Sequence, residues 1–293
     1  MDFVGLVLVG CLVGLTTVLF GFGGGFVTVP IITLVDADLG SDTARVAAAT
    51  SALVMLVNAV VSTISTKRET LAHLRGRWWL FILLAAGGAF GAFCAEFAPN
   101  TLLKWGFVVY IAVTAIDLLA SPGFFRRGGS TVRSSAKVRD AKVRDAKVRD
   151  AKARDGAGVG AEENLSDGGR GIGALFGFPI GGLASFLGVG GSVMTVPMMR
   201  RSGATMTVAT TLANPLTLVI MLPAVLVTIT AHTSVPVPGM VGSLDLYSAA
   251  ALLIGAIPLI VLLRRRVPKI PEILHAWGYV ILLVTAGAVV AVS

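Results

Sequence analysis

Charged residues are scarce in this sequence. Asp, Glu, Lys and Arg together make up 14% of the 293 residues, whereas hydrophobic residues make up 55% and the mean hydropathy is +0.85. This apolar content is far more than the core of one soluble domain can hide. The composition therefore excludes a soluble globular protein and indicates a membrane protein.

Histidine and cysteine are also rare, with three and two residues. The histidines have no Cys, Asp or Glu partners at metal-ligand spacing, so we expect no metal site and no cofactor. Apart from Glu96, Lys104 and Asp117 near their ends, the apolar stretches hold no Lys, Arg, Asp, Glu or His deep within them. Because no nucleophile or acid/base pair is present there, we do not expect an enzyme.

Apolar stretches near the length of ~20 residues that crosses a bilayer recur along the chain. They lie near 3–20, 46–65, 78–97, 102–120, 171–187, 207–230, 246–263 and 274–292. The first stretch has only Asp2 before it and no small-residue cleavage site after it, which favours a retained membrane segment over a signal peptide.

The net charge of +8 comes mainly from one segment. Residues 121–170 contain twelve Lys/Arg and seven Asp/Glu, and residues 136–155 repeat the pattern AKVRD. A five-residue period advances a helix by ~140° per repeat, so the charges form no amphipathic face. The segment also lacks aromatic side chains in its repeats for stacking on bases. It is interpreted as a solvated basic linker, and no nucleic-acid partner is expected.

A glycine-rich decapeptide occurs twice, as GFGGGFVTVP at 21–30 and GVGGSVMTVP at 188–197. At the constant offset of 167, Gly14, Gly21, Gly23 and Gly24 align with Gly181, Gly188, Gly190 and Gly191. A small-residue segment follows each motif, at 47–53 and 208–214. The pattern indicates a tandem duplication, with membrane repeats at 1–120 and 171–293 joined by the linker 121–170.

The distribution of basic residues predicts the topology, because Lys and Arg mark the cytoplasmic ends of membrane segments. Eight simple crossings would place the basic segments 67–77 and 264–269 on opposite sides. The conflict disappears if 3–36 and 171–200 each enter and return on one side. We therefore predict an all-α polytopic protein of the cell membrane with two inverted repeats, each a broken-helix hairpin plus three transmembrane helices. The linker would be cytoplasmic and both termini would lie outside.

The glycine motif predicts a break at which a short helix restarts near Phe26 and near Val193. Glycine costs roughly 1 kcal/mol relative to alanine inside a helix, and the following proline suits the start of a half-helix. The exposed amides at such a start favour an anion. The predicted substrate-binding residues are Gly23, Gly24, Gly25, Thr28, Thr50, Ser51, Asn58, Gly190, Gly191, Ser192, Thr195, Thr210, Thr211 and Asn214.

The alternative is that the small residues serve only for close helix packing. A single motif would favour that interpretation, whereas its repetition with a proline in both halves favours a break. Gly14 lies well before the break, and alanine is expected to be tolerated there if its role is packing.

With these paired motifs and the small Thr/Ser segments behind them, the sequence resembles the sulfite exporter TauE/SafE family. The resemblance implies a secondary transporter of sulfur-containing anions such as sulfite or sulfonates, coupled to a gradient of protons or another cation. Its expected partners are this small anion and the lipid bilayer. An anion-selective channel using the same glycine-rich site is the alternative.

Overall fold

The computed structural model describes residues 3–21, 23–36, 40, 42–66, 78–120, 176–201, 206–231, 239–265 and 271–292. The predicted linker at 121–170 lies outside this part of the chain. The helices are α1 (Phe3–Phe20), α2 (Gly25–Val35), α3 (Thr43–Ile64), α5 (Trp78–Phe97), α6 (Asn100–Ala120), α8 (Gly177–Phe186), α9 (Ser192–Arg201), α10 (Met206–Ile229), α11 (Leu246–Arg265) and α12 (Glu272–Val292). Two short strands, β1 (Met240–Val241) and β2 (Leu244–Asp245), pair antiparallel.

Seven of the described helices are long and apolar enough to cross a membrane: α1, α3, α5, α6, α10, α11 and α12. Many large apolar side chains on these helices are exposed, including Leu8, Phe90, Val113 and Ile281. Lipid is the solvent that such surfaces require. The prediction of an all-α polytopic membrane protein is confirmed.

Both glycine motifs interrupt the helices where the sequence predicts a break. The apolar segment 3–36 divides into α1 and α2, and the segment 171–200 contains α8 and α9. The second helices begin at Gly25 and Ser192, one residue before the predicted restarts at Phe26 and Val193. With 11 and 10 residues, α2 and α9 are too short to cross the bilayer.

The prediction for the prolines is wrong in detail. Pro30 and Pro197 lie in the interior of α2 and α9, at the sixth residue of each helix, and not in the first turn. A proline there removes one backbone hydrogen bond and crowds the preceding turn. The glycines therefore cause the break, and the prolines weaken the short helix that follows it.

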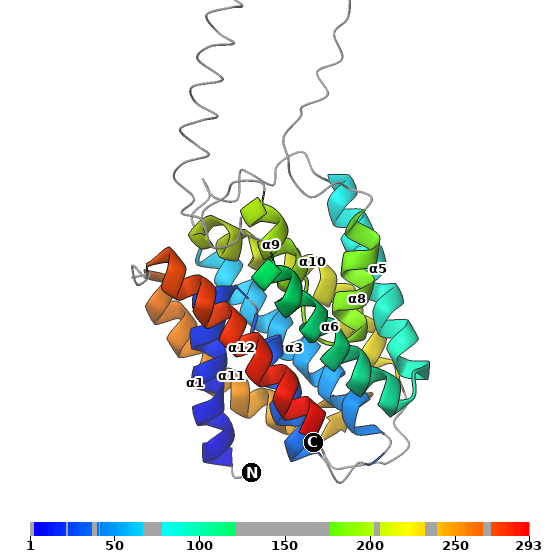
Figure 1. The fold of residues 1–293 in the computed structure, drawn as a ribbon. Coiled ribbons are helices and arrows are strands. Elements are labelled where there is room, and N and C mark those ends of the chain that lie inside the picture. The colour runs from blue at the N-terminus through cyan, green and yellow to red at the C-terminus, as the bar shows by residue number, and fades with distance from the viewer. Residues whose placement is uncertain are drawn as a thin grey trace, which may run out of the picture.

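The hairpins pack crosswise between the two halves of the sequence. Helix α1 packs mainly on α11 of the second half, and α8 packs mainly on α5 of the first half. Two further pairs bring the halves together, because α3 packs on α10 and α6 lies beside α12 (Figure 1). Neither half therefore folds around a core of its own.

The first helices of the two hairpins run in opposite directions. Helix α1 runs parallel to α11, since Gly10 and Gly14 lie against Leu252 and Ala256. Helix α8 runs parallel to α5, since Gly177 and Gly181 lie against Leu80 and Leu84. The end of α5 meets the loop before α11, where Ser243 donates a hydrogen bond to Glu96. If the two halves are inverted, their first helices run in opposite directions, as α1 and α8 do. The inversion itself and the membrane side of each loop stay predictions.

Gly14 does not behave as the sequence predicts. A Cβ atom added at Gly14 would lie 2.6 Å from the carbonyl oxygen of Ala256, which is main chain and cannot rotate away. Alanine at this position would therefore force α1 and α11 apart. The expected tolerance of alanine at Gly14 is wrong, because this glycine allows a close approach of two helix backbones.

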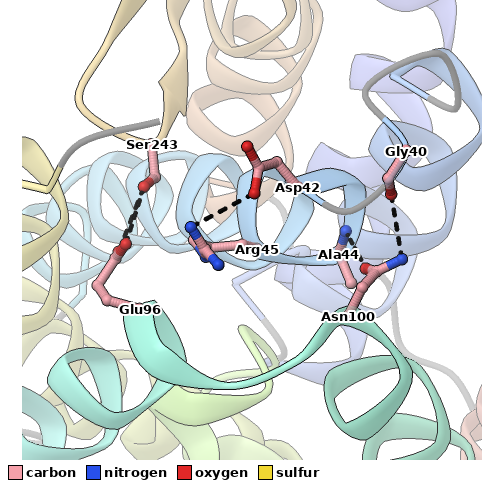
Figure 2. A network of polar contacts seen from close by, with 7 residues as sticks. All are labelled: Gly40, Asp42, Ala44, Arg45, Glu96, Asn100 and Ser243. Atoms are coloured by element: carbon pink, nitrogen blue, oxygen red, sulfur yellow. Dashed lines mark hydrogen bonds and ion pairs between the residues drawn. The ribbon is translucent and has the colours of Figure 1, made fainter. Parts of the chain in front are cut away.

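Both chain termini lie at the same end of the bundle, which we call the terminal end (Figure 1). A polar network ties the loops together there (Figure 2). Asn100 Oδ1 accepts a hydrogen bond from the Ala44 amide at 2.8 Å, and Asn100 Nδ2 donates to the Gly40 carbonyl at 3.2 Å. Arg45 pairs with Asp42 at 3.4 Å. These bonds join the start of α3 to the α5–α6 corner.

Asp36, which follows α2 at this end, gives a pH-dependent prediction. Burial, and next the negative charge of Asp245, raises the pKa of Asp36 to about 6. The folded protein therefore favours the protonated carboxyl, and ionising it as the pH rises through 6 lowers stability. Asp36→Asn is expected to unfold at a higher temperature than the parent at pH 8, and this advantage should shrink as the pH falls toward 4. Thermal unfolding in detergent from pH 4 to 8 measures it, and an advantage that stays constant with pH would contradict the assignment.

Candidate functional site

The two glycine-rich breaks meet in the middle of the bundle. A Cβ atom added at Gly25, the first residue of α2, would lie 2.8 Å from the carbonyl oxygen of Val189 in the second break. Equivalent glycines adopt the same left-handed backbone, with φ of 72° at Gly21 and 65° at Gly188. The duplicated motif therefore forms similar turns in both halves, and the turns are in contact. They differ at one position, since Gly24 has a φ of 97° and its equivalent Gly191 has no positive φ.

Two central helices line the breaks with polar side chains. Helix α3 carries Ser51 and Asn58 seven residues apart, and α10 carries Asn214 and Thr217 three residues apart, so each pair lies on one helix face. All four side chains are fully buried. Because α3 and α10 pack against each other, the polar faces belong to one buried region.

Helix α3 holds a backbone carbonyl in each break. Asn58 Nδ2 donates a hydrogen bond to the Gly23 carbonyl at 3.1 Å, and Ser51 Oγ donates to the Gly188 carbonyl at 2.8 Å. These carbonyls have left the regular helix, and an unpaired one would be costly inside a membrane. One helix of the first half therefore satisfies both breaks.

The hydroxyl groups of the first hairpin all have partners within their own helices. Thr16 and Thr17 donate to the Val13 carbonyl at 3.0 and 2.7 Å. Thr28 donates to the Gly24 carbonyl at 3.1 Å. Since each proton is used locally, this hairpin offers few free hydroxyl donors to a ligand.

The second hairpin differs. The hydroxyls of Ser185, Ser192 and Thr195 are buried and have no hydrogen-bond partner in the described part of the protein. Thr195 is the equivalent of Thr28 at the offset of 167, and its amide makes the same bond, to the Gly191 carbonyl at 3.0 Å. Ser192 begins α9, where the first helical amides lack partners inside the helix. Free hydroxyls and a helix N-terminus therefore coincide at α9.

The remaining predicted residues are distributed around this region. Thr50 accepts a hydrogen bond from the Asp245 amide at 2.9 Å, which connects it to β2 and not to a break. Thr210 is buried beside Gly21, and Thr211 is half-buried. Asn214 Nδ2 donates to the Thr210 carbonyl at 3.3 Å, leaving its Oδ1 without a partner among the described residues.

The sequence prediction missed two buried hydroxyls, on Thr217 and Ser185. Thr217 lies close to Gly23, since its methyl group would be 3.5 Å from a Cβ atom added there. Its position seven residues after Thr210, on the same face of a predicted span, was a usable signal. Ser185 precedes the second motif and has no equivalent hydroxyl in the first half, where Val18 occupies the aligned position.

Carboxylate, imidazole and thiol groups do not gather at the breaks. Within the residues that the structure describes, no three of His, Cys, Asp and Glu lie close enough to hold a metal ion. The polar groups that converge are hydroxyls, side-chain amides and backbone groups. Such neutral groups can hold a small solute by hydrogen bonds in the middle of a membrane protein.

Seven of the described helices are long and apolar enough to span a membrane, and one of them, α1, belongs to the first of the two broken hairpins. Together with the buried polar groups at the breaks, they define a multi-pass membrane transport protein. The model of the family described as sulfite exporter TauE/SafE matches residues 6–290, and the chain belongs to this family. This membership gives the chain a role in membrane transport.

A second comparison agrees on the class. Over 118 residues the chain is 28% identical to a probable membrane transporter protein of Methanocaldococcus jannaschii. The match covers 40% of this chain and 44% of that protein, so it spans less than half of each. No solved structure matches the chain.

Proposed function

We propose that the protein is a secondary transporter of small sulfur-containing anions, such as sulfite or a sulfonate, and that it works by alternating access. The single observation that carries this proposal is the set of unpartnered hydroxyls at the N-terminus of α9. A buried hydroxyl without a partner is costly, so it is expected to persist where a ligand satisfies it. An oxyanion accepts hydrogen bonds at every oxygen and is a suitable ligand.

The residues of the site fit an anion held without a counter-cation. The amides at the start of α9 and the positive end of its helix dipole favour negative charge. Ser192 and Thr195 would add hydroxyl donors from the same turn. Each such bond to a charged ligand is worth roughly 1.5–3 kcal/mol, so a few of them offset the loss of water.

Alternating access fits the way the hairpins are built. The short helices α2 and α9 begin at the two breaks, which are in contact, and they belong to two different hairpins. A motion of one hairpin relative to the other would expose the junction to one end of the bundle at a time. Coupling to a proton or cation gradient belongs to this proposal.

Ligand-dependent stability tests the substrate. Sulfite, sulfate, thiosulfate and methanesulfonate are each added to the purified protein in detergent, with acetate as the carboxylate control. An anion at one hundred times its Kd should stabilise the fold by about 2.7 kcal/mol, which a thermal unfolding curve resolves. If no sulfur anion shifts the curve more than acetate does, the proposed substrate class is wrong.

Flux measurements distinguish a transporter from a channel. In proteoliposomes loaded with the stabilising anion, radiolabelled anion should accumulate by counterflow and saturate with concentration. Single-channel currents without counterflow would instead assign the site to an anion channel.

A further inference from the structure

A cavity of about 140 Å³ lies at the terminal end of the bundle and takes no part in the site described above. Its lining comes from α2, α3, α6, α12 and the turn after α8, and includes Thr33, Ala48, Lys104 and Leu187. The walls are mostly apolar, with one cationic side chain among them. The cavity is therefore large enough for a small solute and has one positively charged side chain in its wall.

The charge of Lys104 is not neutralised by the lining. None of the lining residues that the structure describes is acidic. Among the described residues, an ion pair within 4.0 Å is recorded between Arg45 and Asp42, and Lys104 takes part in none. Lys104 is half-buried and lines the cavity. Apolar walls screen such a charge less than bulk water does, so it attracts anions into the cavity.

The inner end of this cavity adjoins the second glycine break. Leu187 and Ala48 line it, and the next residue after Leu187 is Gly188. A Cβ atom added at Gly188 would lie 2.5 Å from the Cα atom of Ala48, so the break and the cavity wall share the same backbone contact. Ser185 lies two residues before Leu187 and Ser192 lies four residues after Gly188, and their hydroxyls have no partner in the described part of the chain.

The outer rim is formed in part by residues of the polar network. Asn100, Gly40 and Ala44 line the cavity, and the two hydrogen bonds of Asn100 hold this side of α3 against the start of α6 (Figure 2). The rim is thus held by hydrogen bonds between the Asn100 side chain and the main chain, whereas the side chain of Lys104 is flexible.

We propose that this cavity is the vestibule through which the small anion reaches the second break from the terminal end, and that Lys104 is its electrostatic attractor. The inference rests on the proposed function and adds an entry route and a specificity-determining residue to it. Lys104 does not hold the anion in its final position, because it lies on α6 at the cavity and not at the start of α9.

The rate at which an introduced cysteine in the cavity reacts with charged reagents measures the electrostatic field of Lys104 directly. Thr33→Cys is made after replacing Cys11 and Cys94 by alanine, and the purified protein in detergent reacts with two methanethiosulfonate reagents, one bearing a sulfonate and one a trimethylammonium group. The sulfonate reagent should react faster, by about tenfold relative to the cationic one, since focused fields change association rates by 10 to 1,000 times. Methanesulfonate should slow the reaction.

Three variants test whether the preference for the sulfonate reagent depends on a positive charge at position 104. Lys104→Gln should remove most of the preference for the sulfonate reagent, and Lys104→Arg should keep it. The double variant Lys104→Gln/Thr101→Lys keeps the net charge but moves it to an exposed position on the same helix, and it should behave like Lys104→Gln. A preference that survives in Lys104→Gln, or returns in the double variant, would overturn the proposal.

Transport kinetics separate this inference from the function on which it rests. Lys104→Gln should raise KM for the anion about tenfold with kcat nearly unchanged, since steering affects association. Absence of counterflow in the parent would be a failure of the proposed function. Normal counterflow in the parent with the same KM in Lys104→Gln would be a failure of the vestibule alone.

Discussion

Thr195→Val is expected to raise the unfolding temperature of the ligand-free protein and to weaken anion binding at the same time. The Thr195 hydroxyl is fully buried and has no partner among the described residues. Replacing it by a methyl group of the same shape removes a desolvated polar group, which is worth about 1–3 kcal/mol of stability. Losing one hydroxyl bond to a charged ligand should weaken affinity roughly ten- to a hundredfold.

The duplicated sequence supplies a matched control for this variant. Thr28 occupies the equivalent position in α2, is equally buried, and donates its hydroxyl to the Gly24 carbonyl. Thr28→Val should therefore gain no stability, and anion affinity should change by less than about twofold because the lost bond is internal. Thermal unfolding with and without the anion gives both quantities. Equal losses of stability in the two variants would mean that the Thr195 hydroxyl is already satisfied.

Gly91→Ala is expected to be one of the most damaging alanine substitutions among the described glycines. A Cβ atom at Gly91 would fall inside the carbonyl group of Gly182, with the carbonyl carbon at 2.8 Å. Neither atom can rotate away, so α5 and α8 must separate, at a cost of about 1–3 kcal/mol or more. Because α8 leads directly into the second break, transport should be lost along with several degrees of thermal stability.

Gly182→Ala tests the same interface with the opposite expectation. A Cβ atom at Gly182 would lie 3.6 Å from the Gly87 carbonyl oxygen, which is an ordinary contact. Alanine also favours the helix by roughly 0.5–1 kcal/mol over glycine, so stability should be kept or slightly raised. Unfolding temperatures and counterflow of the two variants are compared side by side. Similar behaviour of the two would contradict the close packing of α5 on α8.

The local architecture was predictable from the sequence because its signals are local. Apolar length predicts the spans, and the glycine motifs predict the breaks within one residue of Gly25 and Ser192. The crosswise packing was not predictable in this way. A repeat shows that Gly14 and Gly181 are equivalent, but not that each lies against a helix of the other half. Close contacts between helices depend on which helices pack against each other, and a single sequence does not show which pairs do so.

The candidate site was predictable in its residue types and not in its hydrogen bonds. Thr28 and Thr195 begin the same Thr-Val-Pro sequence in the two motifs, yet one hydroxyl donates to the Gly24 carbonyl and the other has no described partner. Side-chain torsions and neighbouring atoms decide this difference. Lys104 was similarly taken as a residue near a span end, because the cavity beside it is formed by five segments distant in sequence.

The two hydrogen bonds that α3 donates have a mechanical consequence. Ser51 and Asn58 are seven residues apart, which is about 10 Å along a helix, and they hold carbonyls of the second and the first break. Helix α3 is thus a spacer of fixed length between the hairpins. Any displacement of one break from the other would break one of these two hydrogen bonds, and α3 would then stay attached to a single hairpin. In the proposed alternating access, the bodies that move would therefore not coincide with the two halves of the duplicated sequence.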